Sequence, residues 1–188
     1  LYGMLKILKP ILPIKEEDIQ ESINELFKLR NKISSSNISD ENPSQELAKW
    51  IKGIPLIYYP WGLQASAIRF KNSLQENGKT HVIAEDVVEA CHNGIVSWEK
   101  KSNVNPILLQ GKDDYPKTKE RWGIIKEYFD SNGIEYKEIF SENGSIVTKL
   151  INLIYLLDYT SIYYATIQKI DPSPIPSIDF VKKRSTLV

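Results

Sequence analysis

The sequence is poor in the residues that build disulfides and metal sites. Its 188 residues contain one cysteine, Cys91, and two histidines. A single cysteine rules out an internal disulfide and fits a reducing compartment, so we expect a cytoplasmic protein. A structural zinc site needs four ligands that are mostly Cys and His, so no metal is expected.

The sequence also lacks an excess of charge and a long apolar run. Lys+Arg and Asp+Glu each total 24, so the chain has no net field that would attract nucleic acid or an anionic membrane. The most apolar stretch, 150–170, is interrupted by Asp158, Gln168 and Lys169 and falls short of the roughly 20 apolar residues that span a bilayer. We therefore expect neither nucleic acid nor a membrane as a partner.

Motifs of several enzyme classes are missing as well. The sequence has no nucleotide-type phosphate loop, no His-x-x-x-His pair and no Gly-x-Ser-x-Gly nucleophile turn. It begins at Leu1 instead of Met and shows no cleavage-site pattern, which predicts a fragment of a longer protein.

The first 53 residues predict helices. An acidic run, Glu16 to Asp18, suits a helix N-terminus, and a polar loop at 34–43 precedes a short helix that Ser44 is expected to cap. Two apolar stripes at helical spacing come before that loop: Leu5, Leu8, Ile11 and Leu12, then Ile19, Ile23, Leu26, Phe27 and Arg30.

From residue 54 onward strands and helices alternate four times. Such alternation predicts an α/β domain over 54–188, with a mainly parallel, doubly wound sheet between two helical layers. Because ligands in such sheets bind beyond the carboxyl ends of the strands, the tips after Tyr59, Ala84 and Gly111 are the expected places for a site. The predicted strands are 54–59, 80–84, 106–110 and 134–140, and the predicted helices are 63–77, 87–91, 118–129, 145–169 and 175–182.

Two segments, 69–79 and 91–99, resemble those of a known family. Residues 76–79 read Glu-Asn-Gly-Lys, and residues 92–97 read His-Asn-Gly-Ile-Val-Ser before Trp98. The bifunctional phosphoglucose/phosphomannose isomerases of archaeal type have Glu-Asn-Ala-Lys and His-Asn-Glu-Ile-Val-Gly in their second sugar-isomerase (SIS) domain. The opening helix, residues 156–165 and the C-terminal 171–182 also resemble that family, so the similarity covers most of the chain.

The resemblance implies roles for four residues. Glu76 would be the base that moves a proton between C1 and C2 of the sugar, and His92 would open the sugar ring from the other subunit of a homodimer. Lys182, or its neighbour Lys183, would assist the enediolate, and Arg69 is a candidate for phosphate. The family uses no cofactor. Its substrates are sugar phosphates, with glucose 6-phosphate and mannose 6-phosphate giving fructose 6-phosphate.

Departures from the family pattern keep other interpretations open. Gly94 stands where the family has Glu, and no Ser/Thr-rich phosphate loop follows a strand, so we expect the chain alone to be inactive. Outside the resemblance, Glu76 is a solvated helix-end glutamate, His92 a surface histidine and Lys182 part of a solvated face. A non-catalytic sugar-phosphate-binding module or a dimerisation domain of the same fold is the alternative.

Three aromatic residues are expected in the core or an interface: Tyr58, Tyr59 and Trp61.

Overall fold

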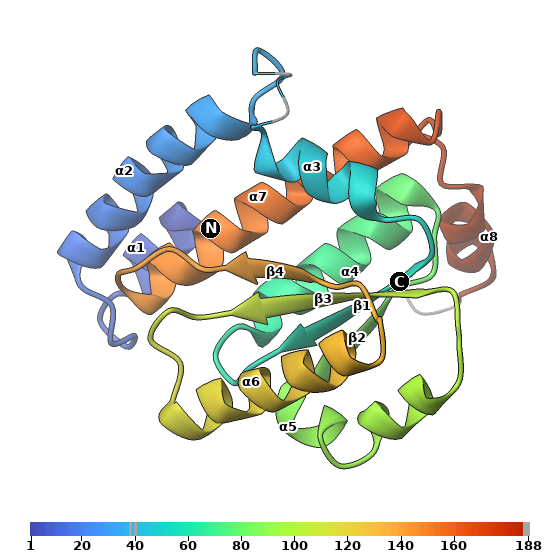
Figure 1. The fold of residues 1–188 in the computed structure, drawn as a ribbon. Coiled ribbons are helices and arrows are strands. Elements are labelled where there is room, and N and C mark those ends of the chain that lie inside the picture. Colours follow the sequence, from blue (N-terminus) through green and yellow to red (C-terminus); the bar gives the residue numbers. More distant parts are fainter. Residues whose placement is uncertain (38, 40, 186–188) are drawn as a thin grey trace.

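The computed structural model describes residues 1–37, 39 and 41–185 (Figure 1). Ile38 and Asp40 of the predicted polar loop lie outside the described residues. The elements, in chain order, are α1 (Tyr2–Leu8), α2 (Glu16–Ile33), α3 (Pro43–Trp50), β1 (Ile54–Tyr59), α4 (Gln64–Gly78), β2 (Ile83–Asp86), α5 (Val87–Ala90), the 3-10 helix η1 (Gly94–Glu99), β3 (Val104–Gln110), α6 (Pro116–Ser131), β4 (Lys137–Phe140), α7 (Ile146–Ile167) and α8 (Pro176–Arg184).

Four parallel strands form one sheet in the order β2-β1-β3-β4. Ile57 of β1 pairs with Ala84 on one side and Ile107 on the other, which fixes the register of the two central strands. Helices α3, α4 and α7 cover one face, and α5 and α6 cover the other (Figure 1). The predicted three-layer α/β/α architecture with a doubly wound parallel sheet is confirmed.

The side chains of the central strands alternate between the two faces of the sheet and contribute to a hydrophobic core on each face. Successive side chains of a strand point to opposite faces, so a strand covered on both sides is apolar throughout. Ile57 and Ile107 pack with α3, α4 and α7, whereas Tyr58 and Leu108 pack with α5 and α6. Each fully buried side chain of this kind stabilises the fold by about 1.5–3 kcal/mol.

The predicted cap of α3 and the predicted starts of β2 and β4 are wrong. Asn42, and not Ser44, caps α3, because its side-chain oxygen accepts from the N–H groups of Ser44 and Gln45 at 3.1 Å. The Ser44 hydroxyl instead donates to the Leu156 carbonyl of α7 at 2.8 Å. Strand β2 starts at Ile83 instead of residue 80, since Ile83 is the first residue that pairs with β1. Strand β4 starts at Lys137 instead of residue 134, because Lys137 is its first residue that pairs with β3.

Aromatic positions were predicted with mixed success. Tyr58 and Tyr59 are buried, whereas Trp61 in the turn after β1 is 91% exposed and does not pack in the core. On α2 the predicted apolar stripe includes Phe27, which is 61% exposed. The buried face of α2 is rotated from that stripe and consists of Ile19, Ser22, Leu29 and Ile33.

A carboxylate ties α2 to the α/β domain. Glu21 accepts a hydrogen bond from the Ser145 N–H at 2.9 Å and from the Thr148 hydroxyl at 2.7 Å, at the N-terminus of α7. The free N–H groups and the helix dipole favour an anion there. These hydrogen bonds, with the Ser145 backbone bond the largest cause, lower the pKa of Glu21. Gly144 allows the approach, since a Cβ there would meet the Glu21 carboxylate at 2.7 Å.

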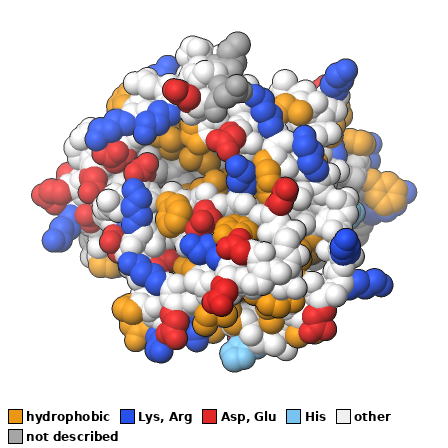
Figure 2. All heavy atoms as spheres, viewed as in Figure 1, with side chains coloured by type: hydrophobic (Ala, Val, Ile, Leu, Met, Phe, Trp, Pro, Cys, Tyr) orange, Lys and Arg blue, Asp and Glu red, His pale blue; other side chains and the backbone are white. Residues whose placement is uncertain are grey.

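The surface carries both signs of charge. Figure 2 shows Lys/Arg and Asp/Glu side chains interspersed over the face in view, which agrees with the balanced composition. None of the helices in the described part of the chain combines the length and the apolarity that crossing a bilayer requires.

We predict that Glu21→Gln lowers the melting temperature at neutral pH. The folded-state pKa of Glu21 is depressed, so its stabilisation is present above the unfolded pKa of about 4.3 and is lost as the pH falls through the folded pKa. Thermal unfolding followed by circular dichroism should show that the difference in melting temperature between Glu21→Gln and wild type becomes smaller as the pH falls into the acid range. Glu25→Gln, which breaks only a pair with Lys28 inside α2, is the matched control with a smaller effect. An equal melting temperature for Glu21→Gln at neutral pH would contradict the anchoring role.

Candidate active site

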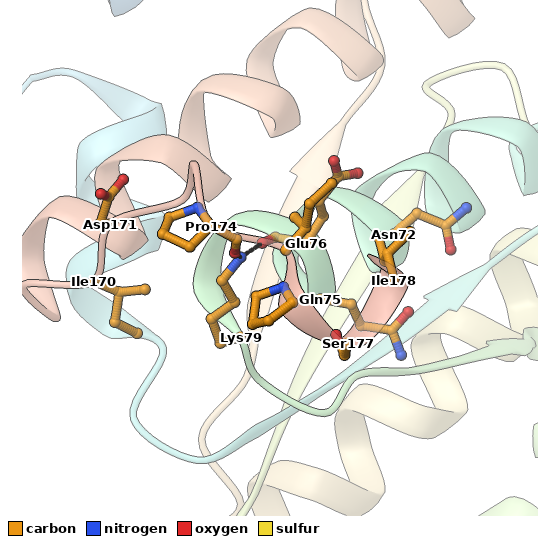
Figure 3. Close-up of a pocket in the computed structure, with 11 residues that line it drawn as sticks. Asn72, Gln75, Glu76, Lys79, Ile170, Asp171, Pro174, Ser177 and Ile178 are labelled. Carbon is orange, nitrogen blue, oxygen red and sulfur yellow. Dashed lines mark hydrogen bonds between the residues drawn. The ribbon is translucent and has the colours of Figure 1, made fainter. Parts of the chain in front are cut away.

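A cleft of about 640 Å³ lies between the end of α4, the segment after α7 and the start of α8 (Figure 3). It contains Glu76, the predicted base. The residues that line it come from segments almost 100 positions apart in the sequence: Asn72, Gln75, Glu76, Lys79, Ile170, Asp171, Pro174, Ile175, Pro176, Ser177 and Ile178.

Helical spacing gives α4 its cleft-facing stripe. The four lining residues of this helix and its cap, Asn72, Gln75, Glu76 and Lys79, are spaced i, i+3, i+4 and i+7, which places them on one face. Three apolar residues of α4 are on another face and are buried: Ala67, Phe70 and Leu74. Because the packed face fixes the helix, the Glu76 side chain extends from a rigid support.

Lys79 closes α4 and connects it to the other wall of the cleft. Its backbone is left-handed, with φ of +50°. Its ammonium group donates to the carbonyl oxygens of Glu76 at 2.7 Å, Pro172 at 3.2 Å and Pro174 at 2.8 Å. Figure 3 shows Lys79 reaching Pro174 while the Glu76 carboxylate extends in another direction. The carboxylate is therefore not neutralised by this lysine.

The cleft lies at the amino ends of the strands, whereas the rule for doubly wound sheets places ligand sites at the carboxyl ends. Glu76 is near the end of α4, which returns from the carboxyl end of β1 to the amino end of β2, and α8 lies beside the tails of the arrows in Figure 1. The tips after Tyr59, Ala84 and Gly111, where a site was expected, are at the carboxyl ends of the strands. The rule for doubly wound sheets and the assignment of Glu76 thus indicate opposite ends of the strands.

Arg69 is engaged in an ion pair between α4 and α7. Its Nε donates to Asp158 Oδ1 and its Nη2 to Asp158 Oδ2, both at 3.0 Å, and the Ser73 hydroxyl donates to the same carboxylate at 2.5 Å. These hydrogen bonds and the charge of Asp158 raise the pKa of Arg69, with a smaller contribution from Glu76. Arg69 therefore joins two helices, and it is not among the residues that line the cleft.

His92 lies on the other side of the sheet from Glu76. It follows α5, which packs with α6, whereas α4 packs with α3 and α7. Its backbone N–H donates to the Glu89 carbonyl at 2.9 Å, and its side chain is exposed. Within one chain the structure does not bring Glu76 and His92 together.

A carboxylate from β2 lies against Gly94, two residues after His92. A Cβ at Gly94 would meet both oxygens of Glu85 at 2.7 Å. Burial, with a contribution from the charge of Glu89, raises the pKa of Glu85. Although Gly94 lacks the side chain that the resemblance leads one to expect there, a carboxylate therefore lies beside this turn.

Lys182 is on α8, whose first turn lines the cleft. It is four residues after Ile178, so both lie on the same face of the helix about one turn apart, whereas Lys183 is rotated by roughly 100°. The side chain of Lys182 is exposed and is not itself a lining residue.

Sequence reasoning missed most of the cleft. The polar stripe of α4 is visible in the sequence as helical spacing, and it could have indicated Asn72, Gln75 and Lys79. The opposite wall, 170–178, has no local signal that links it to α4. In the described part of the chain, no group of three or more His, Cys, Asp or Glu side chains is placed to hold a metal ion.

The three-layer α/β/α fold with the parallel strand order β2-β1-β3-β4 is that of a sugar-isomerase (SIS) domain. The sequence pattern of one such family, the bacterial phospho-glucose isomerase C-terminal SIS domain, matches residues 40–184, and the chain belongs to this family. The matched range includes α3, which contributes Leu47 and Ala48 to the core, and its C-cap Ile51, which lies in the same core.

Individual relatives agree with this membership. A bifunctional phosphoglucose/phosphomannose isomerase of Caldicellulosiruptor bescii is 27% identical over 191 residues, covering 98% of this chain and 55% of the relative. A glucose-6-phosphate isomerase like protein from Thermus thermophilus has the same fold, with a TM-score of 0.73, 16% identity and coverage of 90% of this chain and 57% of that one. The sugar isomerase domain of an RpiR transcription factor from Sphaerobacter thermophilus superposes with a TM-score of 0.58 at 9% identity, covering 90% and 97%. The chain spans about half the length of the curated relatives that it matches.

We predict that Glu85→Gln raises the melting temperature at neutral pH. An acid whose folded pKa is raised destabilises the fold where it is ionised, so the advantage of Gln is present at neutral pH and disappears as the pH falls below the unfolded pKa of about 4.3. Thermal unfolding at several pH values measures this. Glu127→Gln, on the exposed side of α6, is the control and should change little. A lower melting temperature for Glu85→Gln across the whole pH range would contradict the burial argument.

Proposed function

We propose that the chain is an aldose–ketose isomerase domain, part of a longer enzyme that interconverts glucose 6-phosphate, and mannose 6-phosphate, with fructose 6-phosphate. Family membership and the named relatives support this proposal. The observation that carries it is the Glu76 carboxylate, which extends from a packed helix end at a cleft of about 640 Å³.

Glu76 is proposed as the base that serves both sugar carbons. It takes the proton from C2 of the open-chain aldose, a hydroxyl proton is transferred from O2 to O1, and a cis-enediolate with its negative charge on O2 forms. Glu76 then returns its proton to C1, which gives the ketose and regenerates the carboxylate. No oxidant, metal or cofactor is consumed, because the two electrons stay within the sugar. A carboxylate on a rigid support suits a transfer between two neighbouring carbons.

His92 is proposed to open the sugar ring from the second subunit of a homodimer. An imidazole with an ordinary pKa of about 6.5 can donate and accept a proton near neutral pH. Since α4 and the turn after α5 lie on opposite faces of one sheet, His92 of the same chain is not beside Glu76. A two-fold-related copy can supply the imidazole, which supports a shared site.

Lys182 and Arg69 complete the proposal. Lys182 lies one helical turn from the cleft residue Ile178 and would stabilise the enediolate oxygen with its charge. Asp158 already uses Nε and Nη2 of Arg69, so Arg69 would contact phosphate only through Nη1. The main phosphate cradle is expected in the part of the enzyme outside this chain, which is why the chain alone should not turn over substrate. We place the enzyme in the cytoplasm.

A non-catalytic sugar-phosphate-binding or dimerisation module is the second candidate. Gly94 in the His92 turn favours it, as does the occurrence of the fold in the sugar isomerase domain of a transcription factor. Binding of a sugar phosphate to the complete protein without turnover would select this alternative.

We predict that Glu76→Gln in the complete enzyme lowers kcat by at least about 10²-fold, because the amide cannot accept the proton from C2. Substrate binding should change little, since the amide keeps the shape of the carboxylate. Isomerisation coupled to a fructose 6-phosphate assay measures kcat, and calorimetry measures binding. Glu127→Gln, the same change at an exposed position on α6 outside the cleft, is the control and should leave kcat unchanged. Unchanged turnover of Glu76→Gln would sink the assignment of the base.

A further inference from the structure

We infer that Lys79 is a positioning residue that fastens the segment 170–175 and helix α8 to the end of α4, so that the two walls of the cleft keep a fixed separation. Its catalytic consequence rests on the proposed function of Glu76, whereas its structural consequence does not.

The contacts of one ammonium group carry this inference. Lys79 Nζ donates to carbonyl oxygens of two separate segments, Glu76 on α4 and Pro172 and Pro174 after α7, at 2.7–3.2 Å. An ammonium group has three N–H donors, and all three directions are used. The group therefore acts as a cross-link between α4 and the loop that leads into α8.

Among the described residues, few other contacts hold helix α8 to the domain. It contributes no buried residue, and two of its apolar side chains, Phe180 and Val181, are 57% and 64% exposed. The segment that leads to it is short and stiff: Asp171 accepts from the Ser173 N–H at 2.9 Å, and Pro172, Pro174 and Pro176 restrict the backbone. A fixed point on this segment is therefore transmitted to the first turn of α8.

The charge of Lys79 is matched to its place. The last carbonyls of α4 lack partners within the helix and form the negative end of its dipole, which favours a cation. Lys79 also helps to lower the pKa of Asp171, although the hydrogen bonds from Ser173 are the larger causes. Because the ammonium is held by carbonyls and not by the Glu76 carboxylate, the same lysine orders the cleft and leaves that carboxylate accessible.

The test uses amide hydrogen exchange on the complete enzyme. Lys79→Met removes the donors and keeps most of the side-chain length, and we expect exchange in 170–184 to become at least about tenfold faster while β1, β3 and α6 keep their protection. Lys119→Met, an exposed lysine on α6, is the matched control and should leave 170–184 unchanged. Unaltered exchange of 170–184 in Lys79→Met would overturn the inference.

A second variant decides the outcome if Lys79→Met loosens the whole domain. Lys79→Arg keeps the charge and supplies several donors, so protection of 170–184 should return to within about threefold of wild type. If Arg leaves this segment as unprotected as a neutral residue does, the carbonyl contacts are not what holds it, and the inference fails.

Kinetics separate this inference from the proposed function. If both hold, Lys79→Met lowers kcat by about tenfold to a hundredfold with a smaller change in KM, because displaced walls spoil the alignment of the base, and Lys79→Arg restores most of it. If Glu76→Gln leaves turnover unchanged while Lys79→Met still loosens 170–184, the function is wrong and the positioning role stands. If Lys79→Met changes neither exchange nor kcat while Glu76→Gln abolishes turnover, the positioning role is wrong and the function stands.

Discussion

Everything in this structure depends on a parallel sheet whose two central strands are apolar on both faces. Ile57 and Tyr58 are neighbours in β1, yet one packs with α3, α4 and α7 and the other with α5 and α6. Burial of both faces requires helices on both sides, so the first crossover, through α4, lies in one layer and the next two, through α5 and α6, lie in the other. Glu76 is on the first crossover, between β1 and β2, and His92 is on the second, between β2 and β3, so the sheet lies between them.

This separation has a direct consequence for chemistry. A site that needs both the Glu76 carboxylate and the His92 imidazole is not assembled within one copy of this domain, so the proposed mechanism requires a second copy to supply the imidazole. The cleft also lies at the amino ends of the strands, where the C-terminal, negative end of α4 meets the first turn of α8. The ammonium group of Lys79 donates to three carbonyl oxygens, and its positive charge interacts favourably with the negative end of the α4 dipole.

Local signals in the sequence predicted the parts of the fold that local forces determine. Strand β1 was predicted with its observed bounds, because an apolar run ends at Pro60 and Gly62, and Ser145 was predicted at the start of α7, where it is the N-cap. The starts of β2 and β4 were wrong, since they are set by register with β1 and β3. The cap of α3 was wrong because Asn42, directly before Pro43, supplies it, while the Ser44 hydroxyl donates to Leu156. Phe27 and Trp61 could not be placed from periodicity alone, because their exposure depends on how α2 and the turn after β1 meet the rest of the domain.

For the site, the sequence supplied candidate side chains but not their surroundings. Glu76 was named through a family resemblance, and the structure shows that it lines a cleft. The second wall of that cleft comes from 170–178, and the pairing of Arg69 with Asp158 spans 89 positions, so neither is visible to local patterns. In the proposed site, His92 reaches the cleft from a second copy of the chain. Local sequence patterns carry no signal for such a contact between subunits.

The most direct measurement of the shared site is complementation between two inactive forms of the complete enzyme, Glu76→Gln and His92→Gln, after verified exchange of subunits. If each site takes its carboxylate from one subunit and its imidazole from the other, random mixing restores about one site in four to the wild-type composition, and activity should reappear in that proportion. Mixed dimers that form and remain inactive would contradict a site built across the two subunits.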